Sequence, residues 1–169
     1  MIKDSFVVDV YNMSNEIVTY KLDEEKIRRR FDPFEVKKIS AGELRRLFYI
    51  PGGAELLQNY LCVRDDELAQ EFGVPEDMVE YNWTIEDIDR VLLKGSEDEL
   101  ADALEFGPIG IKNVIQDRAI ALKIKNLDKR QLINDYLDVN ITSMIDFLEA
   151  DNDTQEQTDS TSHGRRVKR

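Results

Sequence analysis

Apolar and β-branched residues dominate the first forty positions, in short runs separated by turn-forming residues. The runs SFVVDVY and EIVTYKL are rich in Val, Ile, Tyr and Thr, and NMSN between them is a predicted loop. Every second residue from Val18 to Leu22 is apolar, which is the period of a strand with one buried face. KIRRRF and VKKIS lie on either side of DPFE, where Pro33 favours a turn. The pattern predicts a three- or four-stranded antiparallel sheet.

From residue 40 to about residue 150, the apolar positions recur at helical spacing. Leu44, Leu47 and Phe48 give the i, i+3, i+4 stripe of a short buried helix. Start and stop signals then divide the segment into about seven short helices with no clear repeat period. Capping residues are predicted at the starts, and glycines at the ends. The predicted capping pairs are Ser40 with Glu43, Thr84 with Asp87 and Ser96 with Glu99; Asp128 and Thr142 are further caps, and Gly73, Gly95 and Gly107 are the stops.

The stretch YIPGGAELLQNYL, residues 49–61, carries two adjacent glycines between an aromatic run and a predicted helix. A phosphate-binding loop of the P-loop type needs a Lys and a Ser or Thr directly after its glycines. Here Ala54 and Glu55 follow instead, and Glu55 would occupy the positive helix end that an anion needs. We therefore predict a turn, in which Pro51 ends one helix and the glycines reverse the chain.

The end of the chain has a different composition. After Ala150 no large apolar residue occurs until Val167, so this segment is predicted to lack order in isolation. The sequence thus predicts an α+β protein with a β module at residues 1–39, a helical domain at 40–149 and a flexible tail at 150–169. It leaves open whether the strands and the helices share one core.

The formal net charge of −12 is distributed unevenly over the 169 residues. Residues 1–50 have a net charge of +1, residues 51–148 of −12, residues 149–162 of −5 and residues 164–169 of +4. The acidic middle block repels the phosphates of DNA and RNA over most of its surface. Any contact with nucleic acid is therefore expected only through one of two basic segments.

The first basic segment is a cluster near the end of the predicted sheet. Its candidate partner-binding residues are Arg28, Arg29, Arg30, Lys37 and Lys38. In a regular strand Arg28 and Arg30 lie on the face opposite Arg29, so the three do not form a single patch. The cluster is either a partner-binding surface or a solvated strand face.

The second basic segment is GRRVKR at the end of the sequence, after an acidic spacer. Its candidate partner-binding residues are Arg165, Arg166, Lys168 and Arg169. A short basic segment of this kind suits a detachable contact with nucleic acid, an acidic protein groove or a localisation receptor. Two alternatives stay open: a solubilising tail without a partner, and an expression tag.

Residues that carry chemistry are few. The single cysteine, Cys62, excludes an internal disulfide and a cysteine-based zinc site, and the sole histidine, His163, lies in the polar tail. Asp98 and Asp102 share a helix face and in principle a hard cation, but acids at helix starts also stabilise the helix dipole. We predict no catalytic residue, no cofactor, no metal and no small-molecule substrate, and hence a protein that is not an enzyme.

The sequence also bears on location. No uninterrupted apolar run approaches the roughly 18 residues of a membrane span. The N-terminal residues MIKDSFVVDV lack the apolar core of a signal peptide. We expect no membrane contact and a location inside a cell.

Three stretches resemble a known class of proteins. FDPFEVKKISAGELRRLFYIPGGAELLQNYLCV, SEDELADALEFGPIGIKNVI and DKRQLINDY, which fall within residues 27–138, are similar to small accessory proteins encoded among the virion genes of tailed bacteriophages. The resemblance implies a non-enzymatic role in head or tail assembly, with a capsid, portal or tail protein as partner, in the cytoplasm of a bacterial host or in the virion. The alternative function is a regulatory module that contacts nucleic acid or an acidic partner through the basic tail.

Overall fold

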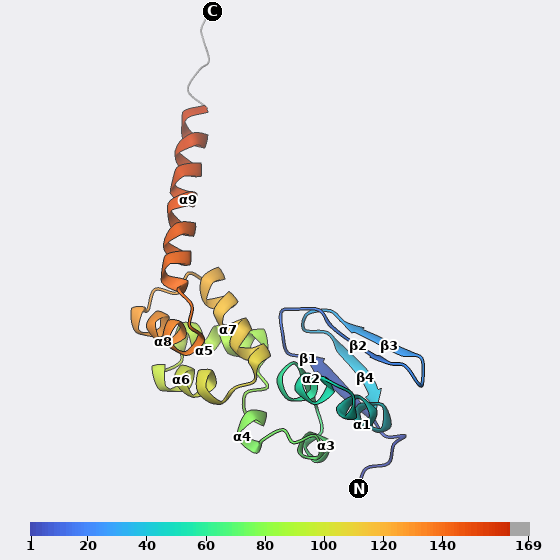
Figure 1. Cartoon of the computed structure of the whole chain (residues 1–169). Coiled ribbons are helices and arrows are strands. Elements are labelled where there is room, and N and C mark those ends of the chain that lie inside the picture. Colours follow the sequence, from blue (N-terminus) through green and yellow to red (C-terminus); the bar gives the residue numbers. More distant parts are fainter. Residues whose placement is uncertain (163–169) are drawn as a thin grey trace, which may run out of the picture.

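The computed structural model describes residues 1–162, apart from the side chains of Asp77 and of residues 152–162. It has the predicted α+β architecture, with an antiparallel β region followed by helices. Figure 1 shows the strands and the first helices at one end of the molecule, the later helices at the other, and α9 projecting from the helical end. Among the described residues, no helix is both long enough and apolar enough to cross a membrane.

The strands form one long bent hairpin with one added strand. β1 pairs antiparallel with β4, and β2 with β3, so that residues 7–22 run alongside residues 27–40. β5 pairs with the edge of β1 that faces away from β4, which gives a sheet of order β4-β1-β5 beside the two-stranded sheet β2-β3. The strands are β1 (Val7–Asn12), β2 (Val18–Leu22), β3 (Ile27–Phe31), β4 (Val36–Ser40) and β5 (Leu61–Val63).

Asn12 holds the bend of the hairpin. Its fully buried side-chain amide donates hydrogen bonds to the carbonyl oxygens of Glu16, at 2.7 Å, and of Asp32, at 3.0 Å. Its Oδ1 accepts from the hydroxyl of Ser14 at 2.8 Å. The side chain thus replaces the ladder hydrogen bonds that the bend interrupts, and the predicted single sheet becomes two sheets.

Three short helices cover the hairpin: α1 (Ala41–Tyr49), α2 (Gly53–Asn59) and α3 (Asp66–Glu71). The Ser40 hydroxyl caps α1 by accepting from the backbone N–H of Glu43 at 3.3 Å, as predicted. The carboxylate of Glu43 does not complete the predicted capping box, because it turns into the core toward Tyr20 and Arg29. β5 was not predicted, because its three-residue apolar run LCV is too short to show a strand period.

The turn between α1 and α2 is the one predicted from its proline and glycines. Gly52 adopts φ +78°, a left-handed conformation that favours glycine. A Cβ on Gly53 would lie 1.7 Å from the carbonyl oxygen of Leu47, so this position needs glycine for the close approach of α2 to α1.

Six further helices make up the second half of the molecule. Thr84 and Asp87 form the complete predicted capping box at the start of α5. Asn126 and Asn140 cap α8 and α9 in place of the predicted Asp128 and Thr142; each accepts at 3.0 Å from the N–H three residues later. The helices are α4 (Glu76–Val79), α5 (Ile85–Lys94), α6 (Glu97–Phe106), α7 (Ile109–Ala121), α8 (Leu127–Leu137) and α9 (Ile141–Ser162).

Two apolar cores divide the molecule. The first lies between the strands and α1–α3 and runs from Val8 to Phe72. The second joins α5–α9 and also includes Tyr11, Met13 and Cys62 from the strand region. The predicted boundary at residues 39 and 40 separates strands from helices, whereas the cores divide after Phe72, because α1–α3 pack on the hairpin.

The predicted flexible tail begins inside α9, which continues through residues 150–162. These residues continue a helix whose first turns are packed against the body. Extending an existing helix costs less free energy than starting one, because each added residue forms a hydrogen bond as its backbone becomes ordered. Residues 163–169, which contain His163 and the basic segment, lie outside the described residues.

Candidate protein-binding surfaces

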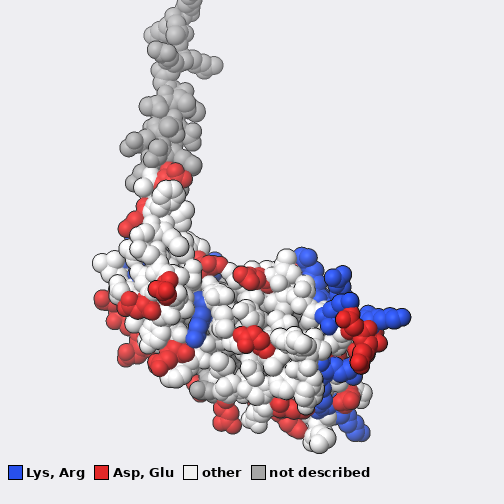
Figure 2. All heavy atoms as spheres, in the orientation of Figure 1, with Lys and Arg blue, Asp and Glu red and all other residues white. Residues whose placement is uncertain are grey.

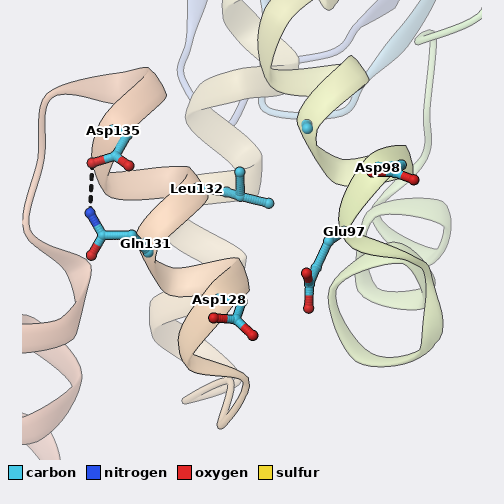
Figure 3. Close-up of a pocket in the computed structure, with 7 residues that line it drawn as sticks. Glu97, Asp98, Asp128, Gln131, Leu132 and Asp135 are labelled. Carbon is cyan, nitrogen blue, oxygen red and sulfur yellow. Dashed lines mark hydrogen bonds between the residues drawn. The ribbon is translucent and has the colours of Figure 1, made fainter.

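An acidic groove of about 340 Å³ runs between α6 and α8. Its carboxylates come from the starts of both helices: Glu97 and Asp98 lie in the first turn of α6, and Asp128 lies in the first turn of α8. Figure 3 shows Glu97 and Asp128 on facing sides of the groove, with Leu132 between the two helices. Farther along α8, Asp135 accepts a hydrogen bond of 2.6 Å from Gln131.

The groove is acidic because the first turns of two helices lie side by side. The side chain of Asn126, the cap of α8, donates to the carboxylate of Glu97 at 3.4 Å and joins the two starts. Each start favours negative side chains through its helix dipole. In the described part of the chain, no group of three or more His, Cys, Asp or Glu side chains has the arrangement of a metal site. Because four carboxylates line it, the groove presents a negative surface.

A second surface lies where α9 leaves the body, and we call Met144, Phe147 and Leu148 the α9 base. Ile141 and Ile145 of the same helix are fully buried against the second core. The side chains of the α9 base remain 45%, 71% and 39% exposed, respectively. The apolar arc of the helix is thus wider than the face that the body covers. Figure 1 shows α9 continuing outward beyond this point.

Most of the predicted basic cluster is neutralised within the β region. Arg29 binds the carboxylate of Glu43 through two hydrogen bonds of 2.8 Å, while Arg28 and Arg30 lie on the opposite, exposed face, as the strand period predicts. Figure 2 shows basic side chains gathered at the hairpin end of the molecule, with acidic side chains among them. The remaining pairs are Arg30 with Asp32, Lys37 with Glu35 and Lys38 with Asp9.

The partner of Arg29 belongs to a buried polar network. The hydroxyl of Tyr20 donates to Glu43 at 2.6 Å, and Glu43 is only 4% exposed. Burial raises the pKa of Glu43, but the hydrogen bonds from Arg29 and Tyr20 outweigh it, so the net pKa lies below its ordinary value. Burial and the adjacent carboxylate raise the pKa of Tyr20. The network keeps one ionised carboxylate inside the first core and has a structural role.

The other residues singled out in the sequence have clear places. Cys62 is buried between the two halves, and burial raises the pKa of its thiol to about 11, so it is the predicted small apolar residue. Arg165, Arg166, Lys168 and Arg169, the candidate residues of the tail, lie outside the described residues.

Sequence reasoning missed the α9 base, although the signal is present. The segment from Ile141 to Leu148 carries five large apolar residues, more than one helix face places against a single neighbour. The excess predicts that part of the apolar arc stays exposed, as it does here at Met144 and Phe147.

Comparison with known proteins adds no relative: no family model matches the chain, and no curated protein and no solved structure gives a significant match.

Proposed function

We propose that the protein is a non-enzymatic assembly protein that docks onto a larger protein complex through the α9 base. The observation that carries the proposal is the exposure of Phe147, 71%, beside two buried isoleucines on the same helix. An aromatic side chain of this size is a common anchor in protein interfaces. The helix carries it in the segment of α9 that follows the buried Ile145.

The surroundings of the α9 base specify the chemistry of the partner. Asp146, Glu149 and Asp151 are exposed on the same helix, and Asp146 reaches the buried Arg130 only at 3.4 Å. A complementary partner surface therefore has an apolar depression for Phe147 with Lys or Arg around it. The resemblance of the sequence to accessory virion proteins makes a capsid, portal or tail protein the expected partner, in a bacterial host cell or its virus particle.

Photo-cross-linking in cells of the native source tests the proposal. We expect a photoreactive phenylalanine analogue at position 147 to yield one defined cross-linked protein, identified by mass spectrometry. Leu93 is the matched control, because it is 57% exposed in the same half of the molecule and belongs to a different helix, α5. Identical products from positions 147 and 93, or no product from either, would contradict the proposal.

The alternative is a regulatory module whose contact with nucleic acid or an acidic partner is made by the tail. The net charge of +4 in residues 164–169, after an acidic spacer, favours it. Binding of DNA or RNA that falls steeply with salt and is lost on deletion of residues 160–169 would support this function. Partner binding that survives the deletion would support the α9 base.

A further inference from the structure

The bent hairpin has a third strand on only one of its two arms. β5 pairs with β1 on the edge that faces away from β4. Among residues 1–162, no strand lies beside the corresponding edge of β2, which faces away from β3. In the described part of the chain, β2 makes no backbone hydrogen bond other than those to β3.

The phase of the ladder shows which backbone groups are free. The pairing ends at Val18 opposite Phe31, and Ile17 and Asp32 share no backbone hydrogen bond beyond it. Hydrogen-bonded pairs alternate along antiparallel strands, so Val18, Tyr20 and Leu22 are the residues bonded to β3. The N–H and C=O groups of Thr19 and Lys21 therefore point to the free edge, where no other described residue accepts or donates.

Two hollows lie along this edge, one at each end of β2. The first, of about 230 Å³, lies beside Val18 and Thr19 and is walled by Leu56 of α2 and by Tyr60, which follows that helix. The second, of about 530 Å³, lies beside Lys21 and Leu22.

The wall of the second hollow comes from the turn between α1 and α2. Tyr49, Ile50 and Pro51 line it, and the Tyr49 side chain is 83% exposed. The segment YIPGGAELLQNYL thus lines both hollows with apolar side chains, in addition to turning the chain.

The opposite edge of the hairpin, along β3 and β4, is protected against strand pairing. Pro33 lies at its bend, and the exposed cations Arg28, Arg30 and Lys38 follow its length. Such residues discourage the pairing of a further strand. The contrast singles out β2 as the edge that is open to a partner.

We propose that the free edge of β2 binds an extended segment of a partner protein, which adds to the hairpin as a further strand. The two hollows flank Val18 and Leu22, four residues or roughly 13 Å apart, so the segment places apolar side chains at positions i and i+4. Its main chain bonds Thr19 and Lys21, as in other cases of strand addition.

The charges at the two ends of β2 indicate which residues of the partner segment flank its two apolar side chains. Glu16 lines the first hollow and Glu24 the second, and among the described residues neither carboxylate has an ion pair. In the second hollow Lys21 is paired with Asp23, and Arg46 with Glu25 at 2.6 Å. The partner segment therefore carries Lys or Arg outside its apolar positions. This inference rests on the proposed function only in that both describe binding to protein, since it uses a different surface.

Selection from a library of displayed random peptides of about nine residues, long enough to span β2, tests the proposal on the full chain. We expect enriched peptides with apolar residues four apart and basic flanks. Thr19→Pro removes one edge N–H and leaves the ladder to β3 intact, and it should weaken the best peptide about tenfold or more. Thr19→Val keeps the N–H and should bind within about twofold of the unchanged chain.

Methylation of the peptide backbone nitrogens distinguishes binding through main-chain hydrogen bonds from binding through side chains alone. We expect methylation at every second nitrogen to abolish binding in one phase and to be tolerated in the other. Equal binding by the Thr19→Pro chain, with its fold verified by circular dichroism, would overturn the proposal, as would the absence of enrichment. Enriched peptides that match this chain's own residues would overturn it in favour of a second copy. Phe147→Ser should leave peptide affinity unchanged, so failure here is distinct from failure of the α9 base.

Discussion

The two halves of the molecule place their buried charges differently. In the hairpin half, charged side chains bind one another: Arg29, Glu43 and Tyr20 form a closed network at the edge of the first core. In the helical half, buried cations bind backbone instead. The ammonium group of Lys129, only 4% exposed, donates to the carbonyl oxygens of Val91, Leu92 and Gly95 at 2.7, 3.1 and 2.7 Å, respectively.

The difference determines which polar groups are left over in each half. Lys129 donates to the carbonyls of Leu92 and Gly95 at the end of α5, and it thereby ties α8 to α5. Glu97, Asp98 and Asp128 at the starts of α6 and α8 have no ion pair among the described residues, and they line the groove between the two helices. In the hairpin half most of the basic cluster is paired with carboxylates, and main-chain groups of β2 have no hydrogen-bond partner among the described residues. The helical half thus presents a negative groove, whereas the hairpin half presents a free strand edge.

The largest effect is expected from breaking the charge network of the hairpin half. Glu43→Ala leaves the Tyr20 hydroxyl and the Arg29 guanidinium without their acceptor, and we expect a loss of about 3 kcal/mol in the free energy of unfolding. Urea titration followed by circular dichroism measures it. Glu43→Gln, which keeps an acceptor of similar size, should lose less. Equal losses in the two variants would show that the hydrogen bonds of the carboxylate contribute little.

Removing the buried amine of the helical half should have a somewhat smaller effect. Lys129→Ala leaves the carbonyl oxygens of Leu92 and Gly95 without their ammonium donor and removes one of the two donors to Val91, and we expect a loss of about 2 kcal/mol in the free energy of unfolding. Lys129→Met keeps most of the apolar stem, so the difference between the two variants separates packing from hydrogen bonding. If Lys129→Met is as stable as the unchanged chain, the contacts with the carbonyls do not stabilise the fold.

Acid should weaken the hairpin network by a fraction of the Glu43→Ala effect. The folded-state pKa of Glu43 lies below its ordinary value of 4.5. The stability it contributes is therefore fully present above pH 4.5 and is lost as the pH falls through the folded pKa. We expect thermal melts to show a flatter acid dependence for Glu43→Gln than for the unchanged chain. Parallel pH curves for the two proteins would contradict this role.

The smallest effect sharpens the contrast between buried and exposed charges. Lys38 binds Asp9 at 2.9 Å across the outer face of β1 and β4, but its side chain is 76% exposed. Lys38→Ala should therefore change the free energy of unfolding by less than about 0.5 kcal/mol. A loss comparable with that of Lys129→Ala, measured by the same urea titration, would show that exposure is a poor guide to charge energetics here.

Much of the fold is predictable from the sequence because its signals are local. Strand alternation, the capping box of Thr84 and Asp87, and the stop at Pro51 each depend on neighbouring residues, and each is present in the structure. β5 and the bend at Asn12 depend on contacts between distant segments, so no pattern of neighbouring residues predicts them. The alternative caps Asn126 and Asn140 lie two residues before the predicted ones, within the usual error of helix boundaries.

The candidate surfaces are less accessible to sequence reasoning than the fold. The alternation of Arg28, Arg29 and Arg30 is predictable, but the partner of Arg29 is on a helix 14 residues away. The groove between α6 and α8 arises only when two helix starts come together in space. The free edge of β2 is visible only once the strand order is known, because the sequence does not show which strand lacks a neighbour.

The order of the two cores along the chain bears on how the molecule forms during synthesis. Residues up to Phe72, which leave the ribosome first, contain every member of the first core and can collapse before α5 is made. Tyr11, Met13 and Cys62 are fixed in that early unit but belong to the second core. Until the later helices emerge, these three side chains lack the neighbours that bury them in the folded protein, and we expect α5–α9 to pack against them as they form.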